Sequence, residues 1–143
     1  MKQFISTCES DTLNIARDFA SRLHGGDVVA FRGGMGMGKT KFVSGCADVL
    51  GLDCDVSSPT FSIVNDYGGS INVYHFDMYR VESWESLYST GFFDYLNENS
   101  ILFIEWSENI DNVLPENIIT VEISRGENDT DRFINIDGGD GRW

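Results

Sequence analysis

The sequence is poor in basic residues. It holds 10 Lys and Arg residues against 23 Asp and Glu residues, which gives a formal net charge of −13 at pH 7. Nucleic-acid binding depends on Lys and Arg side chains that meet phosphates, so a surface of this charge repels nucleic acid. The composition therefore argues against strong direct nucleic-acid binding unless a partner protein supplies a basic face. Acidity by itself indicates solubility and no particular activity.

Long apolar runs and a disulfide framework are also absent. No stretch approaches the length of a membrane-spanning helix, and the N-terminus lacks the charged, apolar and small-residue pattern of a signal peptide. The three cysteines, Cys8, Cys46 and Cys54, are odd in number and have no metal-ligand spacing. We expect reduced thiols in a cytoplasmic protein without membrane association, and Cys46 as a small core residue.

Nothing in the sequence divides the chain into parts. It contains no internal repeat, low-complexity segment or domain linker. A hydrophobic content of 41% over 143 residues is that of one ordinary globular domain with a sizeable core. We therefore expect a single domain over residues 1–143, in which residues 138–143 form a frayed tail.

What the sequence does contain is a phosphate-binding P-loop. Residues 33–40, Gly-Gly-Met-Gly-Met-Gly-Lys-Thr, match the pattern of Gly, four residues and Gly-Lys-Thr. The apolar run 27–32 predicts a buried strand before the loop, and the spacing over 41–50, closed by Gly51, predicts a helix after it. Glycines and a helix N-terminus turn backbone N–H groups toward one point, which attracts phosphate. Lys39 would reach the outer phosphates and the Thr40 hydroxyl would hold Mg²⁺.

The remaining pattern predicts an α/β fold with a mixed sheet. Further strands are predicted at 3–6, 61–64, 71–76, 101–104, 118–123 and 132–136, and further helices at 12–23 and 82–97. The Gly68-Gly69 turn predicts a hairpin, so antiparallel strands must join the parallel ones. The expected architecture is a single-domain P-loop NTPase fold, with a mixed sheet that is mostly parallel at its centre and with helices on both faces.

Glu105 directly follows the apolar strand 101–104. In P-loop proteins an acidic residue at that place commonly holds Mg²⁺, directly or through water. An ordinary strand-end carboxylate is the alternative interpretation. The chain has no Asn-Lys-x-Asp motif for guanine, and its arginines are scattered rather than clustered in a lid as a small-molecule kinase needs. ATP is therefore the expected nucleotide.

Four further motifs follow the P-loop in the order found in one family. They are Ser58-Pro59-Thr60-Phe61, His75-Phe76-Asp77-Met78-Tyr79-Arg80, Gly91 and Glu105-Trp106. With them the chain resembles the bacterial TsaE (formerly YjeE) family over nearly its full length. The resemblance implies a P-loop ATPase required for threonylcarbamoyladenosine in tRNAs that read codons beginning with A. It also implies work with TsaD and TsaB, the pair that carries out the transfer to tRNA, and we hypothesise that slow ATP hydrolysis resets their complex.

The resemblance also implies roles for single residues. Lys39 and Asp77 look like the catalytic residues, and Asp77 would orient the attacking water or accept its proton. Thr40 and Glu105 look like the ligands of Mg²⁺. The implied nucleotide-binding set is Gly33, Gly36, Met37, Gly38, Lys39, Thr40, Lys41, Thr60, Trp106, Thr12 and Arg132, of which the last two would border the adenine.

Several of these positions have a second, structural interpretation. Asp77 also fits a strand-end turn, and Trp106 fits a packed core side chain. Residues 58–60 fit either a switch that senses the γ-phosphate through Thr60 or a proline turn capped by hydroxyl groups. His75 is interpreted as a hydrogen-bonded structural histidine rather than a base, and the pair 79–80 as a surface for a partner.

One departure from the family pattern stands inside the P-loop. The family usually has an acidic residue and leucine after the first glycine, where this chain has Gly34 and Met35. A backbone cradle tolerates that change, but the lost carboxylate would alter how the loop docks on a partner. Two other functions also stay open: a small-molecule kinase, and a module whose nucleotide binding alone assembles a complex.

Overall fold

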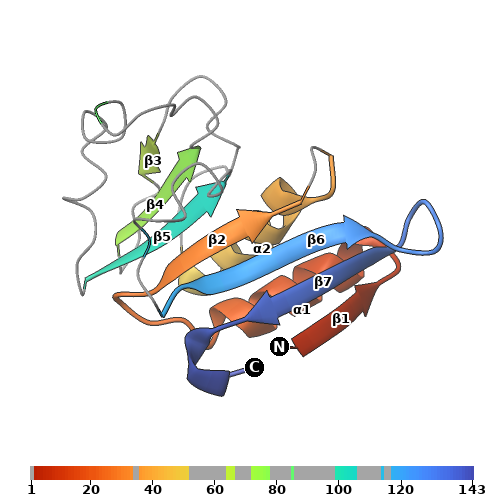
Figure 1. Cartoon of the computed structure of the whole chain (residues 1–143), viewed down its shortest axis with the longest axis horizontal. Coiled ribbons are helices and arrows are strands. Elements are labelled where there is room, and N and C mark those ends of the chain that lie inside the picture. The colour runs from red at the N-terminus through yellow and green to blue at the C-terminus, as the bar shows by residue number, and fades with distance from the viewer. Residues whose placement is uncertain are drawn as a thin grey trace.

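The computed structural model describes residues 2–33, 36–51, 64–66, 72–77, 85, 99–105, 114 and 117–143. Figure 1 shows one twisted sheet with helices behind it. The elements are β1 (Lys2–Ser6), α1 (Glu9–Ala20), β2 (Val28–Arg32), α2 (Lys39–Leu50), β3 (Val64–Asp66), β4 (Asn72–Asp77), β5 (Ser100–Glu105), β6 (Ile119–Arg125), β7 (Arg132–Asp137) and a short 3₁₀ turn at Gly139–Gly141.

The sheet is mixed, as the sequence predicts. Its strand order is β1-β7-β6-β2-β5-β4-β3. The four central strands run parallel, because β2 pairs in parallel with β5 and β6, and β5 with β4. Antiparallel strands extend both sides: β3 pairs with β4, and β7 pairs with β6 and β1. The predicted α/β class with a mixed sheet, parallel at its centre, is confirmed, including the antiparallel pairing expected for the strands before and after Gly68-Gly69. Helices on both faces were predicted as well, and that part stays a prediction.

Both described helices cover the same face of the sheet. Phe19 of α1 and Phe42 of α2 contact each other, with ring centroids 5.4 Å apart, and Phe42 contacts Phe31 of β2 at 5.8 Å. The opposite face of the central strands is buried as well, at Val28, Ala30, Leu102 and Ile104. The strands buried on two faces read as continuous apolar runs for this reason. The helix predicted at 82–97 lies outside the described residues except for Glu85.

Three predicted helix boundaries are wrong. The first helix begins at Glu9 rather than residue 12, because the backbone N–H and the hydroxyl of Thr7 both donate to the Asp11 carboxylate, at 3.0 and 2.8 Å. It ends at Ala20 rather than residue 23. After Ala20, the N–H groups of Arg22 and Leu23 donate to carbonyls three residues back, which is the tighter 3₁₀ pattern. The second helix begins at Lys39, inside the P-loop motif, and ends as predicted at Gly51, whose φ of 71° is left-handed.

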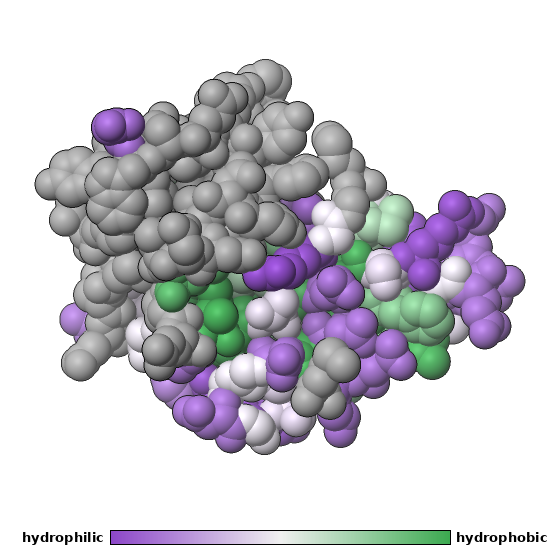
Figure 2. All heavy atoms as spheres, in the orientation of Figure 1, coloured by the Kyte–Doolittle hydropathy of each residue, from purple (hydrophilic) through white to green (hydrophobic). Residues whose placement is uncertain are grey.

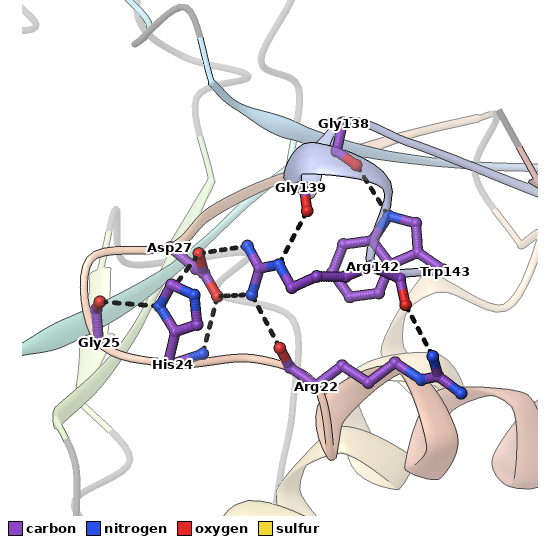
Figure 3. A network of polar contacts seen from close by, with 8 residues as sticks. All are labelled: Arg22, His24, Gly25, Asp27, Gly138, Gly139, Arg142 and Trp143. Carbon is purple, nitrogen blue, oxygen red and sulfur yellow. Dashed lines mark hydrogen bonds and ion pairs between the residues drawn. The ribbon is translucent and has the colours of Figure 1, made fainter.

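The expectation of a frayed tail is also wrong. Residues 138–143, which we call the C-terminal clasp, fold against the start of β2 and the end of α1 (Figure 3). Arg142 donates to both oxygens of the buried Asp27 carboxylate, at 2.9 and 2.8 Å. The Trp143 ring lies 4.7 Å from that of Phe19. Local patterns missed the clasp because its partners are 115 residues apart in sequence.

The visible surface over β1, β6 and β7 is largely hydrophilic (Figure 2). Within the described part of the chain, the large apolar side chains that are exposed are Ile5 and Val49. None of the helices among the described residues has the length and apolar character needed to cross a membrane.

Candidate nucleotide site

Several of the predicted site residues lie at one edge of the sheet. Strands β4, β5 and β2 are parallel neighbours and end at this edge, from which the chain turns into α2 (Figure 1). In the register, Asp77 pairs with Glu105, and Glu105 pairs with Phe31, two residues before the P-loop. The edge at the carboxyl ends of parallel strands is where such sheets bind ligands. The fold therefore brings the backbone of Asp77, Glu105 and Gly33 together from three separate segments.

Two glycines give the P-loop its shape. Gly33 has a φ of 129°, and a Cβ atom there would lie 2.2 Å from the carbonyl oxygen of Ile123 in β6. Only glycine fits, because both the backbone conformation and the contact exclude a side chain. Gly38 adopts a φ of 105° immediately before the first residue of α2. The loop thus starts tight against β6 and passes directly into the N-terminus of a helix, the geometry that favours phosphate.

The Lys39 side chain lies between the start of the P-loop and the end of β5. Its side chain is buried, and Nζ donates to the Gly33 carbonyl at 3.1 Å. The same Nζ lies 3.9 Å from Oε1 of Glu105. An ammonium group held between a loop carbonyl and a carboxylate is positioned where an entering phosphate would meet it. Thr40 follows as a half-buried residue in the first turn of α2.

Glu105 is buried at 4% exposure and contacts a second nitrogen. Its Oε2 lies 2.8 Å from Nε2 of His75, which has no exposed surface. The burial of His75 agrees with the sequence-based interpretation of a structural side chain. What the sequence analysis missed is the partner, although the place of His75 two residues before Asp77 on the same strand was a usable signal.

Three further described residues of the implied nucleotide set have partners in the protein. Arg132 donates from Nε to the carbonyl of Met37 at 3.2 Å, and from Nη1 to two carbonyls of the preceding loop. Lys41 lies 3.6 Å from Glu9, which places the first turns of α1 and α2 side by side. Thr12 is 6% exposed, and its hydroxyl lies 2.7 Å from that of Ser6. Thr60 and Trp106 lie outside the described residues.

The donor set suits a magnesium nucleotide. Mg²⁺ prefers oxygen ligands and usually keeps several waters, with one or two protein groups and the substrate phosphates completing its shell. Glu105 and Thr40 supply such oxygen atoms beside the loop. The described part of the chain contains no group of three or more His, Cys, Asp or Glu residues that would form a metal site of another kind. The described residues therefore fit Mg²⁺ held jointly with phosphate.

Comparison with known proteins identifies the family. Residues 6–134 match the family described as threonylcarbamoyl adenosine biosynthesis protein TsaE. The tRNA threonylcarbamoyladenosine biosynthesis protein TsaE of Rickettsia typhi is 40% identical over 120 residues, which span 80% of this chain and 81% of that protein. The protein of the same name from Treponema pallidum is 33% identical over 119 residues, covering 83% of this chain and 88% of the relative.

A solved structure agrees with this result. The crystal structure of Bacillus subtilis YdiB superposes with a TM-score of 0.80 at 27% sequence identity, over 99% of this chain and 88% of YdiB. Sequence and fold thus lead to the same relatives. The chain belongs to the TsaE family.

Proposed function

We propose that this protein is a Mg²⁺-dependent ATPase whose hydrolysis of ATP resets a TsaD–TsaB complex after each modification of tRNA. The broader role follows from membership of the family: TsaE proteins act in tRNA threonylcarbamoyladenosine biosynthesis. The hydrolysis, the metal and the two partner proteins are our proposal.

The observation that carries the proposal is the position of Lys39. Its buried ammonium group lies 3.1 Å from the Gly33 carbonyl at one end of the P-loop and 3.9 Å from Glu105 at the next strand end. A buried cation next to a backbone N–H cradle and a helix N-terminus favours a polyanion such as a nucleotide triphosphate. Burial also strengthens each electrostatic contact, since the local dielectric constant is lower than that of water.

Each chemical role then falls to a particular side chain. Lys39 would bind the outer phosphates and stabilise the charge that develops on them as the bond between the γ-phosphorus and its bridging oxygen breaks. Asp77 would orient the attacking water or accept its proton. Thr40 and Glu105 would hold Mg²⁺, which, when bound, neutralises phosphate charge. Thr60, Trp106, Thr12 and Arg132 would complete the nucleotide site.

The acidic character of the chain supports a protein partner over direct binding of tRNA. A net charge of −13 repels the phosphates of tRNA. In this proposal TsaD and TsaB hold the tRNA, and the protein engages them through its own surface. Residues 79–80, beside Asp77, are candidates for that surface.

The test is ATP hydrolysis by the purified protein, alone and with TsaD, TsaB and tRNA, with Lys39→Ala as the control variant. We expect slow turnover by the protein alone, stimulation when all partners are present, and loss of both in the variant. Stimulation of the Lys39→Ala variant equal to wild type would refute the proposed site. Unchanged hydrolysis on addition of the partners would refute the proposed role of the TsaD–TsaB complex while leaving nucleotide binding intact.

A further inference from the structure

We propose that the loop between β6 and β7, residues 126–131, sets the affinity for nucleotide by positioning the P-loop through Arg132. We call these residues the β6–β7 loop. The family resemblance assigns none of them to the nucleotide site. Arg132 is then a positioning residue, which acts through the backbone of the P-loop. The inference rests on the proposed function, because it concerns the same nucleotide site.

The sheet topology places the β6–β7 loop beside the P-loop. Strands β2 and β6 are parallel neighbours, so the P-loop after β2 and the β6–β7 loop leave the sheet at the same end (Figure 1). Arg125 and Arg132 form the last pair of the β6–β7 ladder, and residues 126–131 project beyond them. Gly33 at the start of the P-loop packs against the backbone of Ile123 in β6. The two loops therefore begin next to each other.

One guanidinium group joins the two loops. Nη1 of Arg132 donates to the carbonyl oxygens of Asp129 and Asp131, both at 2.7 Å. Nε of the same side chain donates to the carbonyl oxygen of Met37 in the P-loop, at 3.2 Å. A guanidinium group is planar and rigid, so two hydrogen bonds at one nitrogen fix the direction in which the other N–H groups point. The carbonyls of the β6–β7 loop therefore direct Nε toward the P-loop.

Internal hydrogen bonds hold the β6–β7 loop itself. The N–H of Gly126 donates to the Asp131 carbonyl at 2.9 Å, and this is one of the two oxygens that Arg132 also contacts. The N–H of Asp131 donates to the Asn128 carbonyl at 3.0 Å, and the Asn128 side chain donates to the Asp131 carboxylate at 2.9 Å. Hydrogen-bond networks of this kind carry energetic coupling between sites. A shift of the Asp131 carbonyl would thus reach Met37 through Arg132.

Gly126 is the position from which that carbonyl can be moved. A Cβ atom at Gly126 would lie 2.6 Å from the Cβ atom of Asp131 and 3.1 Å from its carbonyl carbon. Carbon atoms in favourable contact are about 3.5–4.0 Å apart, so Gly126→Ala forces the backbone of Asp131 to shift. Gly126 is not among the glycines with a positive φ, so alanine adds no strain of its own there. The substitution therefore acts on Asp131 and on the group that Asp131 orients.

The experiment is a double-mutant cycle on the affinity for ADP. Isothermal titration in excess Mg²⁺ gives the dissociation constant of wild type, Gly126→Ala, Arg132→Lys and the double variant. The temperature is one at which thermal unfolding without nucleotide shows each protein to be folded. Lysine keeps the positive charge of Arg132 but lacks the planar fork that joins the two loops. Thr130→Ala is the matched control, because Thr130 is exposed in the same loop and its replacement leaves the charge unchanged.

We expect Gly126→Ala to weaken ADP binding about fivefold when Arg132 is present, the value of one lost hydrogen bond. In the Arg132→Lys background the link between the loops is already broken, so the same substitution should change the affinity less than about twofold. Thr130→Ala should bind ADP as wild type does. A substitution that merely destabilised the fold would lower the affinity in both backgrounds alike, so the cycle separates positioning from a structural role.

Two results would overturn the inference. One is wild-type affinity in Gly126→Ala. The other is an equal loss of affinity from Gly126→Ala in both backgrounds, because the β6–β7 loop would then act without Arg132. Should Gly126→Ala fail to fold, a shorter loop takes its place in the cycle with the same expectations: Asn-Gly replaces residues 127–130, which removes the Asp129 carbonyl and suits a tight hairpin. A wild-type protein that does not bind ADP would instead refute the proposed function, so the wild-type titration tells the two failures apart.

Discussion

Arg132, the first residue of β7, donates a hydrogen bond from Nε to the carbonyl oxygen of Met37 in the P-loop, 3.2 Å away. The contact joins residues 95 positions apart. A carbonyl that is bonded outward leaves the neighbouring N–H groups of the loop free to face a ligand. The family resemblance implies that Arg132 borders the adenine, and the contact that the structure describes is with the P-loop itself.

This contact gives a prediction for Arg132→Lys. Lysine keeps the positive charge but lacks the planar fork that reaches Met37 and the carbonyls of Asp129 and Asp131 together. We expect nucleotide affinity to fall about fivefold, the value of one lost hydrogen bond. Isothermal titration with ADP would measure it, with Arg125→Lys as the control, since Arg125 is 62% exposed at the other side of the same hairpin. Wild-type affinity in Arg132→Lys would show that charge alone is sufficient.

The P-loop glycines give a second prediction. Gly33→Ala would force a Cβ atom to 2.2 Å from the Ile123 carbonyl oxygen, so we expect it to lower the free energy of unfolding by about 3 kcal/mol or more. Gly36→Ala is the matched control: its φ of 76° is strained for alanine, but apart from its chain neighbours no atom of the described residues lies within 4 Å of the new Cβ. There we expect a loss of about 1 kcal/mol. Urea unfolding would measure both, and equal losses would contradict the close approach of the loop to β6.

The C-terminal clasp predicts a pH dependence of stability. Burial alone would raise the pKa of Asp27, but hydrogen bonds from Arg142 and the His24 backbone, with the charge of Arg142, outweigh it and lower this pKa. A carboxyl group with a lowered pKa in the folded state stabilises the protein above its unfolded pKa of about 3.9. That contribution is lost as the pH falls through the lower folded pKa. We expect Asp27→Asn to cost about 2 kcal/mol at pH 7, the range for a hydrogen bond to a charged group.

The measurement is urea unfolding of wild type and Asp27→Asn at pH 7, pH 5 and pH 3. The difference in the free energy of unfolding between wild type and Asp27→Asn should be the same at pH 7 and pH 5 and smaller at pH 3. Asp48→Asn is the control, because Asp48 is 58% exposed in its pair with Arg17 and such surface pairs contribute less than about 1 kcal/mol. A stability difference between wild type and Asp27→Asn that increases as the pH falls would contradict the lowered pKa of Asp27.

Cysteine reactivity gives a fourth prediction. Burial raises the pKa of the Cys46 thiol, whereas Cys8 is exposed. The thiolate is the reactive form, so Cys46 should resist thiol reagents in the folded state. In a Cys54→Ser background, Ellman's reagent at pH 8 should label one thiol rapidly and the second only after denaturation in urea. Rapid labelling of two thiols in the native protein would place Cys46 outside the core.

The local pattern was sufficient for those parts of the fold that depend on neighbouring residues. The apolar run before the P-loop predicted β2, and a further strand predicted at 132–136 is found as β7. The place of Glu105 after an apolar run indicated the strand end where it lies. The P-loop spacing alone indicated the turn from β2 into α2, because few other sequences combine those glycines with Lys-Thr.

Contacts between distant segments could not be predicted in this way. The sequence gives no period that joins Arg132 to Met37 or Arg142 to Asp27. The partner of His75 became evident only when the register placed β4 beside β5. Each of these polar contacts depends on tertiary structure. The contact of Arg132 adds a role to a residue of the implied nucleotide set, and the contact of Arg142 shows that residues 138–143 are folded.

The anchoring of the P-loop has a consequence for how the chain is made. Gly33 of the P-loop packs against Ile123 of β6, and Met37 accepts a hydrogen bond from Arg132 of β7. Ile123 and Arg132 are synthesised long after residues 33–40. Contacts of such sequence separation form late in folding, because a long loop must close first. A nascent chain that stops before β6 would carry the complete motif without its anchors. Under the proposed function, nucleotide binding should therefore develop only when synthesis is almost finished, so that incomplete chains would not bind ATP.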